Sequence, residues 1–450
     1  MKFKNIYGTL LLATAAIASG TLFTSCEDEP DKFELTSGTP TINYIRPARL
    51  SASDSLLVQA GPEATICLVG SNLTSIEQMY FNDLKAILNT SYITDKTLIV
   101  TVPKDIPNLV TDKIYMITKG HDTLTYDFHI VIPAPQVNNM SCEYAAPGST
   151  ATINGNYFVD DPNVPLEVIF PDGQKATNLE INDSRSTITF TVPNCTTEGQ
   201  VSVKSIYGTT KSSFRYLDTR GMLFDFDTPN AVTGVVLGNH GWHAQKIESD
   251  ATSLSGNFLR LGDPAVTLTA DGAWNDGNFS FEYWPGNWQD PEDYQGDGVR
   301  LTSIADFKDY SNMSYKFEML VPASNPWTSG AMQIIVGGVD KITNGSAGVK
   351  DIDGTTLGGA NNTYFNNDDL PRGIYRPWES TGSFDTADQW ITVTIPISDF
   401  KYGMSGGAAK GNLSAKDFSS LTIFVVGGGV SGTDGQPVIK IDNIRAVPNK

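Results

Sequence analysis

Residues 64–73 read ATICLVGSNL and residues 149–158 read STATINGNYF. Each segment predicts a strand that ends in a turn, because an apolar run is interrupted by a glycine and an asparagine. Further along, residues 97–103 read TLIVTVP and residues 187–193 read TITFTVP. Apolar residues alternate along both segments, which buries one face of each strand, and the final proline ends the hydrogen-bonded ladder. The shared order of motifs predicts two copies of one small β domain.

The two copies are offset by 85 to 90 residues, which is about the size of an immunoglobulin-like sandwich. Their pattern resembles the IPT/TIG immunoglobulin-like family over residues 40–217, and predicts domains at residues 40–133 and 134–217. Pro133 and Pro135 lie between the copies, where X-Pro segments are extended and stiff. We interpret the pair, which contains no tryptophan, as a semi-rigid stalk. A direct ligand site in these domains is the alternative.

The N-terminus has the features of a secretory signal over residues 1–25. A basic start is followed by an apolar run at residues 6–18, which is too short to span a membrane. Residues 22–26, LFTSC, resemble a bacterial lipobox, in which Cys26 would become the first mature residue and carry the lipid. That lipid would be the only membrane anchor. An ordinary signal peptide with a stray cysteine is the alternative.

An acidic run follows the predicted lipid cysteine within a linker at residues 26–39. Residues 27–31 read EDEPD, which resembles the surface-export signal of Bacteroidetes lipoproteins. A solvated acidic linker is the alternative interpretation.

Composition excludes several classes of protein. The 450 residues carry 31 Lys and Arg against 50 Asp and Glu, a formal net charge of −19. Such a charge argues against binding to nucleic acid and against attraction to anionic lipid head groups. With 40% hydrophobic and 18% charged residues the chain is not disordered. The 41 glycines and 24 prolines favour an all-β architecture with many turns.

Beyond Cys26 the chain has three cysteines, Cys67, Cys142 and Cys195. An odd number cannot pair completely within one chain. Cys142 and Cys195 share a predicted domain and could form a disulfide. Buried free thiols are the interpretation that we prefer.

All the tryptophans lie in the predicted C-terminal domain, residues 218–450. They are Trp242, Trp274, Trp284, Trp288, Trp327, Trp378 and Trp390. Tryptophan is large and amphipathic and stacks well on flat, weakly polar partners. A pyranose ring presents such a face, and its rim of hydroxyl groups can be recognised by amide or charged side chains nearby.

Four of these tryptophans are candidates for contact with a ligand. Residues 279–290 read FSFEYWPGNWQD, so a strand is broken by Pro-Gly and Trp284 and Trp288 fall at its end or in the following loop. Trp242 and Trp274 lie in polar loops interrupted by glycine. Binding residues gather on loops over a rigid β scaffold. Packing in the core is the alternative for each residue.

The remaining apolar segments predict about eight strands, which suit a jelly-roll-like β-sandwich. Trp390 begins the alternating segment WITVTIP at residues 390–396 and is expected in the core or at a sheet edge. Trp327 follows Asn-Pro and is expected to pack at the base of a loop.

The order of lipobox, acidic run, tandem IPT/TIG domains and tryptophan-rich sandwich resembles the surface glycan-binding proteins of Bacteroidetes polysaccharide-utilisation systems. The B type of this family, whose last domain binds xyloglucan or a related β-glucan, is the most similar in kind. Similar segments are FDFD (224–227), YRPWE (375–379), WITVTIPI (390–397) and IDNIR (441–445). The resemblance implies an aromatic platform that contains an adjacent Tyr-Trp pair, here Tyr283 and Trp284. An earlier tryptophan, either Trp242 or Trp274, would complete it.

The resemblance also implies a function. The chain would capture a plant β-glucan without catalysis, beside a TonB-dependent outer-membrane importer and a sister glycan-binding lipoprotein. A surface adhesin or structural lipoprotein that recognises protein or host glycan is the alternative. A glycoside hydrolase is less favoured. It needs two positioned carboxylates, and acidic residues are too abundant here for their presence to indicate a pair. The chain also contains no H-E-x-x-H motif.

No cofactor is expected apart from a structural Ca²⁺, which carbohydrate-binding jelly rolls often hold through carboxylates and carbonyls. Asp225, Asp227 and Asp442 lie near the first and last predicted strands of the C-terminal domain. These two strands often pair in such folds. Solvent-facing carboxylates are the alternative.

Overall fold

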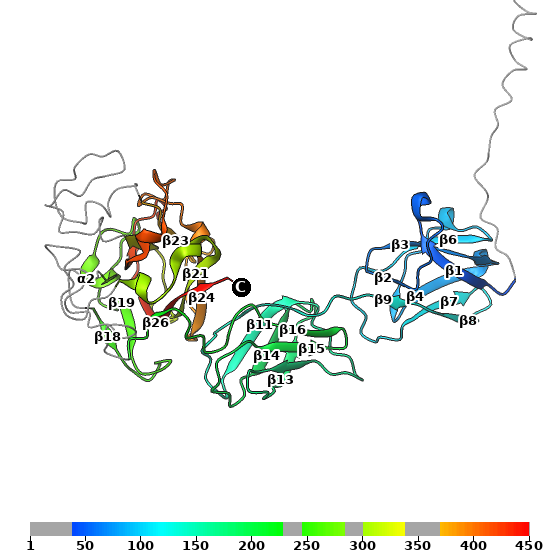
Figure 1. The fold of residues 1–450 in the computed structure, drawn as a ribbon, viewed down its shortest axis with the longest axis horizontal. Coiled ribbons are helices and arrows are strands. Elements are labelled where there is room, and N and C mark those ends of the chain that lie inside the picture. The colour runs from blue at the N-terminus through cyan, green and yellow to red at the C-terminus, as the bar shows by residue number, and fades with distance from the viewer. Residues whose placement is uncertain (1–37, 228–244, 284–299, 338–369, 450) are drawn as a thin grey trace, which may run out of the picture. The chain divides into compact units, whose positions relative to one another are not determined.

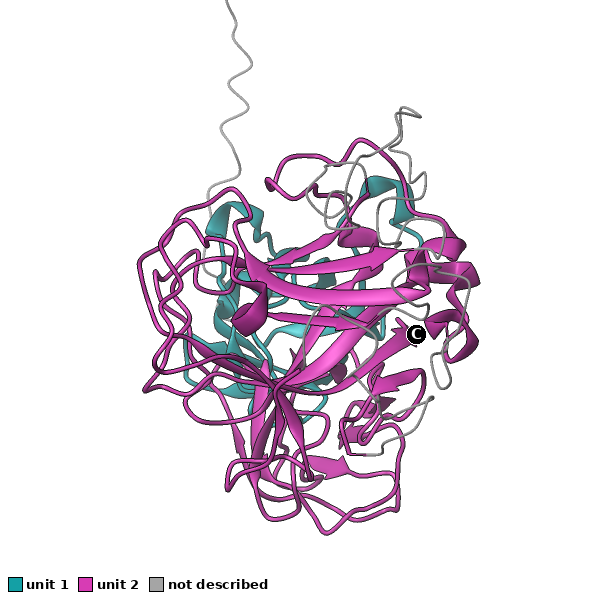
Figure 2. Ribbon diagram, turned by 90° about the vertical axis from the view of Figure 1, so that its left-hand side faces the viewer, with its two compact units in different colours: residues 1–132 teal, residues 133–450 magenta. Residues whose placement is uncertain are grey.

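The computed structural model describes residues 38–227, 245–283, 300–337 and 370–449 (Figure 1). These residues build β-sandwiches, so the predicted all-β fold is confirmed. The chain divides into two compact units, residues 1–132 and 133–450, which Figure 2 colours separately. In the part of the chain described, no helix combines the length and the apolar character that crossing a membrane requires.

The first unit is an immunoglobulin-like sandwich, drawn blue to cyan in Figure 1. One sheet has the order β1-β3-β6, the other has the order β5-β4-β7-β8, and a short parallel pair joins β2 to β9. The strands are β1 (Thr41–Pro47), β2 (Gln59–Ala60), β3 (Thr65–Ser71), β4 (Ile76–Phe81), β5 (Leu84–Lys85), β6 (Thr97–Thr101), β7 (Lys113–Thr118), β8 (Thr123–Asp127) and β9 (His129–Ile130). Single-turn 3₁₀ helices are η1 (Leu50–Ala52), η2 (Leu73–Ser75) and η3 (Thr90–Tyr92).

The second copy of the repeat forms the first part of the second unit. Its sheets have the orders β10-β11-β14-β13 and β12-β15-β16. The strands are β10 (Gln136–Met140), β11 (Thr150–Asn156), β12 (Glu167–Ile169), β13 (Thr177–Ile181), β14 (Thr187–Thr191), β15 (Ser202–Ser205) and β16 (Gly208–Lys211). Alternate residues such as Ile153, Ile188 and Phe190 are buried between the two sheets.

The repeated glycine has a specific packing reason. In the first copy β3 pairs with β1, and in the second copy β11 pairs with β10. A Cβ atom at Gly70 would lie 1.8 Å from the carbonyl oxygen of Thr41, and one at Gly155 would lie 1.7 Å from that of Gln136. Only glycine allows this close approach of two backbones. The motif therefore marks where the first strand of each sandwich lies closest to the strand that it pairs with.

The C-terminal sandwich packs two larger sheets. One has the order β18-β19-β26-β21-β24, with β17 also paired to β26, and the other has the order β20-β25-β22-β23. The strands are β17 (Met222–Phe224), β18 (Ile247–Glu248), β19 (Phe258–Gly262), β20 (Ser280–Tyr283), β21 (Met313–Leu320), β22 (Ala331–Gly337), β23 (Gly373–Tyr375), β24 (Ile391–Pro396), β25 (Ser420–Val426) and β26 (Val438–Pro448). The short helices are α2 (Asp276–Phe279), η5 (Leu301–Ser303), η6 (Phe307–Asn312), η7 (Ile397–Asp399) and η8 (Ala415–Phe418).

The core of this sandwich is rich in aromatic rings. Phe224 contacts Phe281 edge to face at 5.0 Å between centroids, and Phe307 stacks on Phe418 at 4.5 Å. The first strand, β17, pairs with the last, β26, as the sequence predicted for the two ends of the domain. That pairing closes the six-stranded sheet around the chain termini of the domain.

The cysteines Cys67, Cys142 and Cys195 are free and buried. The disulfide left open between Cys142 and Cys195 is therefore absent, and the preferred interpretation of buried thiols holds. Burial raises the pKa of both Cys142 and Cys195 above the usual range of a thiol, so each stays protonated and unreactive at neutral pH.

Candidate functional site

The four-stranded sheet β20-β25-β22-β23 presents two different faces because its residues alternate. On β25, Leu421 and Ile423 point into the sandwich core, so Thr422 and Phe424 point to the other side. The register places Glu282 of β20 opposite Thr422, and Gln333 of β22 opposite Phe424. The side of the sheet away from the core, here called the outer face, therefore carries polar groups in strands that are otherwise apolar.

These polar groups are buried and joined by hydrogen bonds. The Arg372 guanidinium donates to the Gln333 side-chain oxygen at 3.0 Å, and the Gln333 amide donates to the Val426 carbonyl at 2.9 Å. The Ser280 hydroxyl donates to Glu282 at 3.0 Å. The Thr422 hydroxyl is buried and has no hydrogen-bond partner among the residues that the structure describes. A buried group without a partner is costly, so a ligand or water at this hydroxyl would be favoured.

Trp274 stands at the rim of this polar layer. Its side chain is 42% exposed, and its ring meets Phe424 edge to face at 4.7 Å. A small pocket lies between the tryptophan and the sheet. Its lining residues are Trp274, Glu282, Ile335, Arg372, Met404, Thr422, Phe424 and Val426. An exposed indole above hydrogen-bonding groups is the arrangement that stacks on a sugar ring and recognises its hydroxyl groups.

The structure separates the predicted platform residues. Tyr283 is 3% exposed and its ring packs edge to face against Phe224 in the core. This differs from an exposed Tyr-Trp pair, because the alternation that turns Glu282 outward turns Tyr283 inward. The predicted contact of Tyr283 with glycan stays a prediction. Trp242, Trp284 and Trp288 lie outside the described residues.

The other tryptophans have structural roles. Trp327 and Trp378 are buried, and both indole N–H groups donate to the carbonyl of Gly330, at 3.2 and 2.8 Å. Trp327 packs at the base of a loop, as predicted. Trp390 is half-buried next to β24, packs against Phe258 and donates to the carbonyl of Thr252 at 2.7 Å. It therefore lies at a sheet edge, as predicted.

Sequence reasoning missed the polar residues of the pocket. Glu282 lies in FSFEY and Gln333 in MQIIVG, each a polar residue inside an apolar strand. A buried polar residue is informative because it requires a partner, and this signal was present in the sequence. Arg372 carries no such signal, because it precedes a strand of only three residues.

The three carboxylates proposed for calcium come from the paired ends of the domain. The Ser255 hydroxyl lies between Asp227 and Asp442, at 3.4 and 3.5 Å from their oxygens. Across the described ranges, however, the structure contains no group of three His, Cys, Asp or Glu side chains arranged to hold a metal ion. The calcium site therefore stays a prediction.

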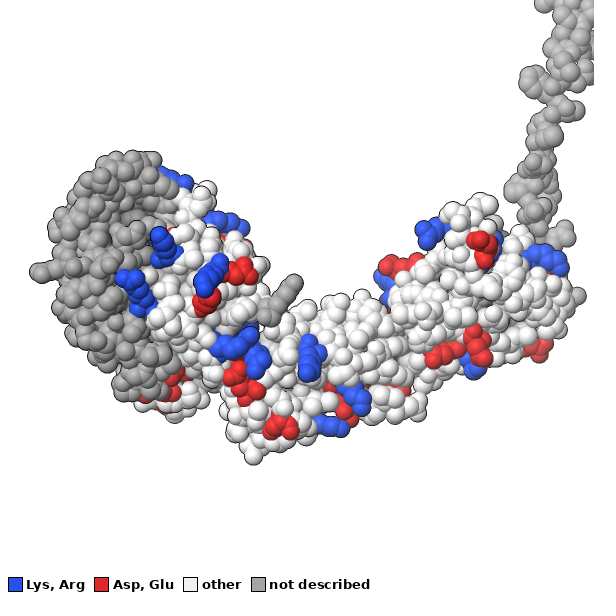
Figure 3. Space-filling view, in the orientation of Figure 1, with Lys and Arg blue, Asp and Glu red and all other residues white. Residues whose placement is uncertain are grey.

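The charges on the described surface are mixed. In the face shown in Figure 3, lysine and arginine side chains are interspersed with aspartate and glutamate. The pocket beside Trp274 is lined by one acidic and one basic residue, Glu282 and Arg372. Such a site suits a neutral, hydroxyl-rich ligand better than a highly charged one.

Residues 216–448, more than half of the sequence, match the family described as the surface glycan-binding protein B xyloglucan binding domain. The chain belongs to the surface glycan-binding protein B family. This family assignment confirms the resemblance inferred from the sequence, and it places the chain among proteins of the cell surface that bind glycans.

Two relatives support the assignment over different lengths. The crystal structure of the surface glycan-binding protein PbSGBP-B from Prevotella bryantii is 50% identical, with a TM-score of 0.81, and covers 92% of this chain and 100% of that chain. An IPT/TIG domain-containing protein of Bacteroides ovatus is 26% identical over 283 residues. That match covers 59% of this chain and 55% of the relative, so the chain spans about half the length of that relative.

Proposed function

We propose that this surface glycan-binding protein captures a plant β-glucan, xyloglucan or mixed-linkage β-glucan, through the outer face of the sheet β20-β25-β22-β23. The observation that carries the proposal is Trp274. Its exposed ring lines a small pocket together with Glu282, Arg372 and Thr422, whose hydroxyl has no hydrogen-bond partner among the described residues. The family match to a xyloglucan binding domain names the class of ligand.

Recognition would combine two kinds of contact. The indole of Trp274 stacks on the apolar face of one glucose ring, and the polar side chains of the pocket bind hydroxyl groups at its rim. An open site of this kind buries little area, so each site binds weakly, in the micromolar range or above. Long chains that contact many copies of the protein gain affinity by multivalency.

We further propose that the protein binds without cleaving. Glycoside hydrolysis requires two carboxyl groups across the scissile bond. Among the residues that line the described pocket, Glu282 is the single carboxylate, and its neighbours Ser280 and Thr422 are hydroxyl groups. This arrangement supports holding a sugar more than protonating its leaving group.

The proposal includes a location for the protein on the cell surface. Cys26 would carry a lipid that anchors the chain in the outer membrane, and the acidic run after it would direct export to the surface. The partners would be a TonB-dependent importer and a sister glycan-binding lipoprotein. Replacement of Cys26 by serine should release the protein from the membrane fraction of cells, whereas retention there would contradict the anchor.

Calorimetric titration with a polysaccharide panel tests the proposed ligand. Residues 27–450 are titrated with xyloglucan, barley β-glucan, galactomannan, xylan and starch. We expect saturable heat with one of the two β-glucans and at least about tenfold weaker binding in Trp274→Ala, because aromatic anchors dominate such contacts. Release of reducing ends on prolonged incubation would contradict the absence of catalysis.

The control is Tyr92→Ala, which removes another exposed aromatic ring, 57% exposed, from the first sandwich. Its affinity should equal that of the unaltered protein. Equal binding by Trp274→Ala would remove this tryptophan from the site. No heat with any polysaccharide would favour the alternative of an adhesin that recognises protein or host glycan.

A further inference from the structure

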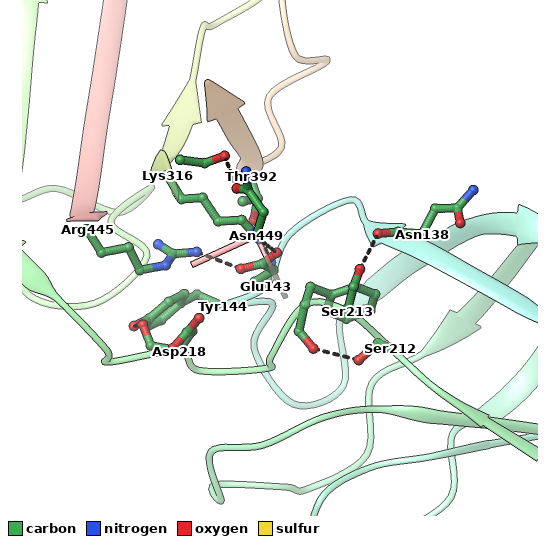
Figure 4. A network of polar contacts seen from close by, with 12 residues as sticks. Asn138, Glu143, Tyr144, Ser212, Ser213, Asp218, Lys316, Thr392, Arg445 and Asn449 are labelled. Atoms are coloured by element: carbon green, nitrogen blue, oxygen red, sulfur yellow. Dashed lines mark hydrogen bonds and ion pairs between the residues drawn. The ribbon is translucent and has the colours of Figure 1, made fainter. Parts of the chain in front are cut away.

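A cluster of four charged side chains joins the second immunoglobulin-like domain to the C-terminal sandwich. Figure 4 labels three of them, Glu143, Lys316 and Arg445. Glu143 comes from the loop between β10 and β11, Lys316 and Glu318 from β21, and Arg445 from β26. Arg445 contacts both glutamates, at 2.8 Å from an oxygen of each, and Lys316 contacts Glu143 at 2.5 Å. The cluster therefore links residues that are about 300 positions apart in the sequence.

The central members of the cluster are inaccessible to water. Arg445 and Glu318 are 0% exposed and Glu143 is 2% exposed. The guanidinium of Arg445 also lies over the ring of Tyr144, at 5.1 Å from its centroid. Burial by itself would lower the pKa of Arg445, but the charges of Glu318 and Glu143 raise it instead. Arg445 is thus held as a cation by partners from two different domains.

Hydrogen bonds of the backbone extend the same contact to a third strand. The Glu143 N–H donates to the Thr392 hydroxyl at 2.7 Å, and this hydroxyl donates to Glu318 at 2.9 Å. The Thr392 N–H donates to the carbonyl of Ser141 at 2.8 Å. The loop that carries Glu143 therefore covers the polar side of the strands β26, β21 and β24, which are neighbours in the six-stranded sheet.

The charge balance of the cluster depends on Glu143. With Glu143 present, two carboxylates face two cations. Without it, Arg445 and Lys316 face one carboxylate, and one positive charge stays uncompensated beside the fully buried Arg445. Removal of one partner from a buried ion cluster is strongly destabilising, whereas the intact cluster contributes little net stability. Among the residues that the structure describes, the second carboxylate of this cluster comes from the second domain.

We infer that the second immunoglobulin-like domain is a structural part of the glycan-binding module, because its Glu143 completes the buried charge cluster of the C-terminal sandwich. The first sandwich belongs to a compact unit of its own, residues 1–132. From the sequence we interpreted the two repeats as equivalent parts of a stalk. The structure gives them different functions. One is a separate unit, and the other belongs to the binding module.

Hydrogen exchange of the chain spanning residues 27–450 tests this inference. In Glu143→Ala, amides of β21 and β26 should exchange roughly 100-fold faster than in the unaltered protein. Amides of β3 and β6 in the first unit should not change. Trypsin should also cut after Arg220, next to the joint, at least about tenfold faster.

The matched control is Glu167→Ala in the same domain. Glu167 pairs with Lys175 at 2.6 Å on the surface, away from the joint, so exchange in β21 and β26 should stay unchanged. Glu143→Gln keeps the size of the side chain and should show a smaller increase, which gives a reading even where Glu143→Ala does not fold. Unchanged exchange in β21 and β26 in both Glu143 variants would overturn the inference. So would a loss of protection confined to β11 and β14.

Discussion

Asp442 shows how the position of one residue sets its charge. It lies on β26 with a fully buried side chain, and its hydrogen-bond partners are the N–H of Asn443 and the hydroxyl of Ser255. Burial raises the pKa of Asp442 to about 8, and the charges of Glu318 and Asp227 add to the rise. At neutral pH this carboxyl group is therefore largely protonated, unlike an ordinary aspartate.

The raised pKa predicts how stability depends on pH. Between about pH 4, where the unfolded side chain ionises, and pH 8 the folded state holds the additional proton, so stability falls as pH rises. In Asp442→Asn, which resembles the protonated acid, this fall should be shallower, with a gain of a few kcal/mol at pH 8. Thermal unfolding from pH 5 to 8 in the presence of a chelator measures it.

The exposed Asp399, in η7 of the same sandwich, supplies the comparison. Asp399→Asn removes one exposed carboxylate and controls for the loss of an acidic group. If the stability of Asp442→Asn changed with pH in the same way as that of the unaltered protein, Asp442 would be ionised in the folded protein. Stabilisation of the unaltered protein by added Ca²⁺, lost in Asp442→Asn, would support the calcium site proposed from the sequence.

At the scale of elements, successive side chains on one strand point to opposite faces of the sheet and so make different contacts. On β20, Glu282 points to the pocket and Tyr283 to the core. On β21, Lys316 contacts Glu143 of the second domain and Glu318 contacts Arg445 of β26, while Phe317 lies in the core. Each sheet of the C-terminal sandwich thus has a polar side, and the two polar sides serve different contacts. One faces the proposed glycan, and the other faces Glu143.

The close approach of β10 and β11 at Gly155 predicts the effect of adding one methyl group there. In Gly155→Ala the added Cβ would overlap the carbonyl of Gln136, so β10 and β11 must move apart. We expect a loss of about 3 kcal/mol in the free energy of unfolding of the second unit. Gly277→Ala has no neighbour within 4 Å and should be nearly neutral. Denaturant unfolding monitored by tryptophan fluorescence compares the two variants, and equal midpoints would refute the crowding argument.

At the scale of the whole molecule, the division into two units predicts separate unfolding. Ile66 is buried in the first sandwich, and Ile66→Ala should lower the stability of that unit by about 2–5 kcal/mol. Because the tryptophans and the proposed site belong to the second unit, glycan affinity should be unchanged. Calorimetric unfolding should show one transition shifted and one retained. A shift of both transitions would mean that the units unfold together.

Local patterns in the chain were sufficient for the fold class, the repeat and the gathering of tryptophan in the last domain. Period-two alternation and turn residues act over a few positions, so they can be read directly. The exposure of Trp274 and the burial of Tyr283 could not be predicted from local patterns, because they depend on which side of a sheet faces the core. The polar pocket and the cluster of Glu143 with Arg445 arise only when distant strands pair. Electrostatic contacts of that kind depend on distance in space, for which sequence separation is no guide.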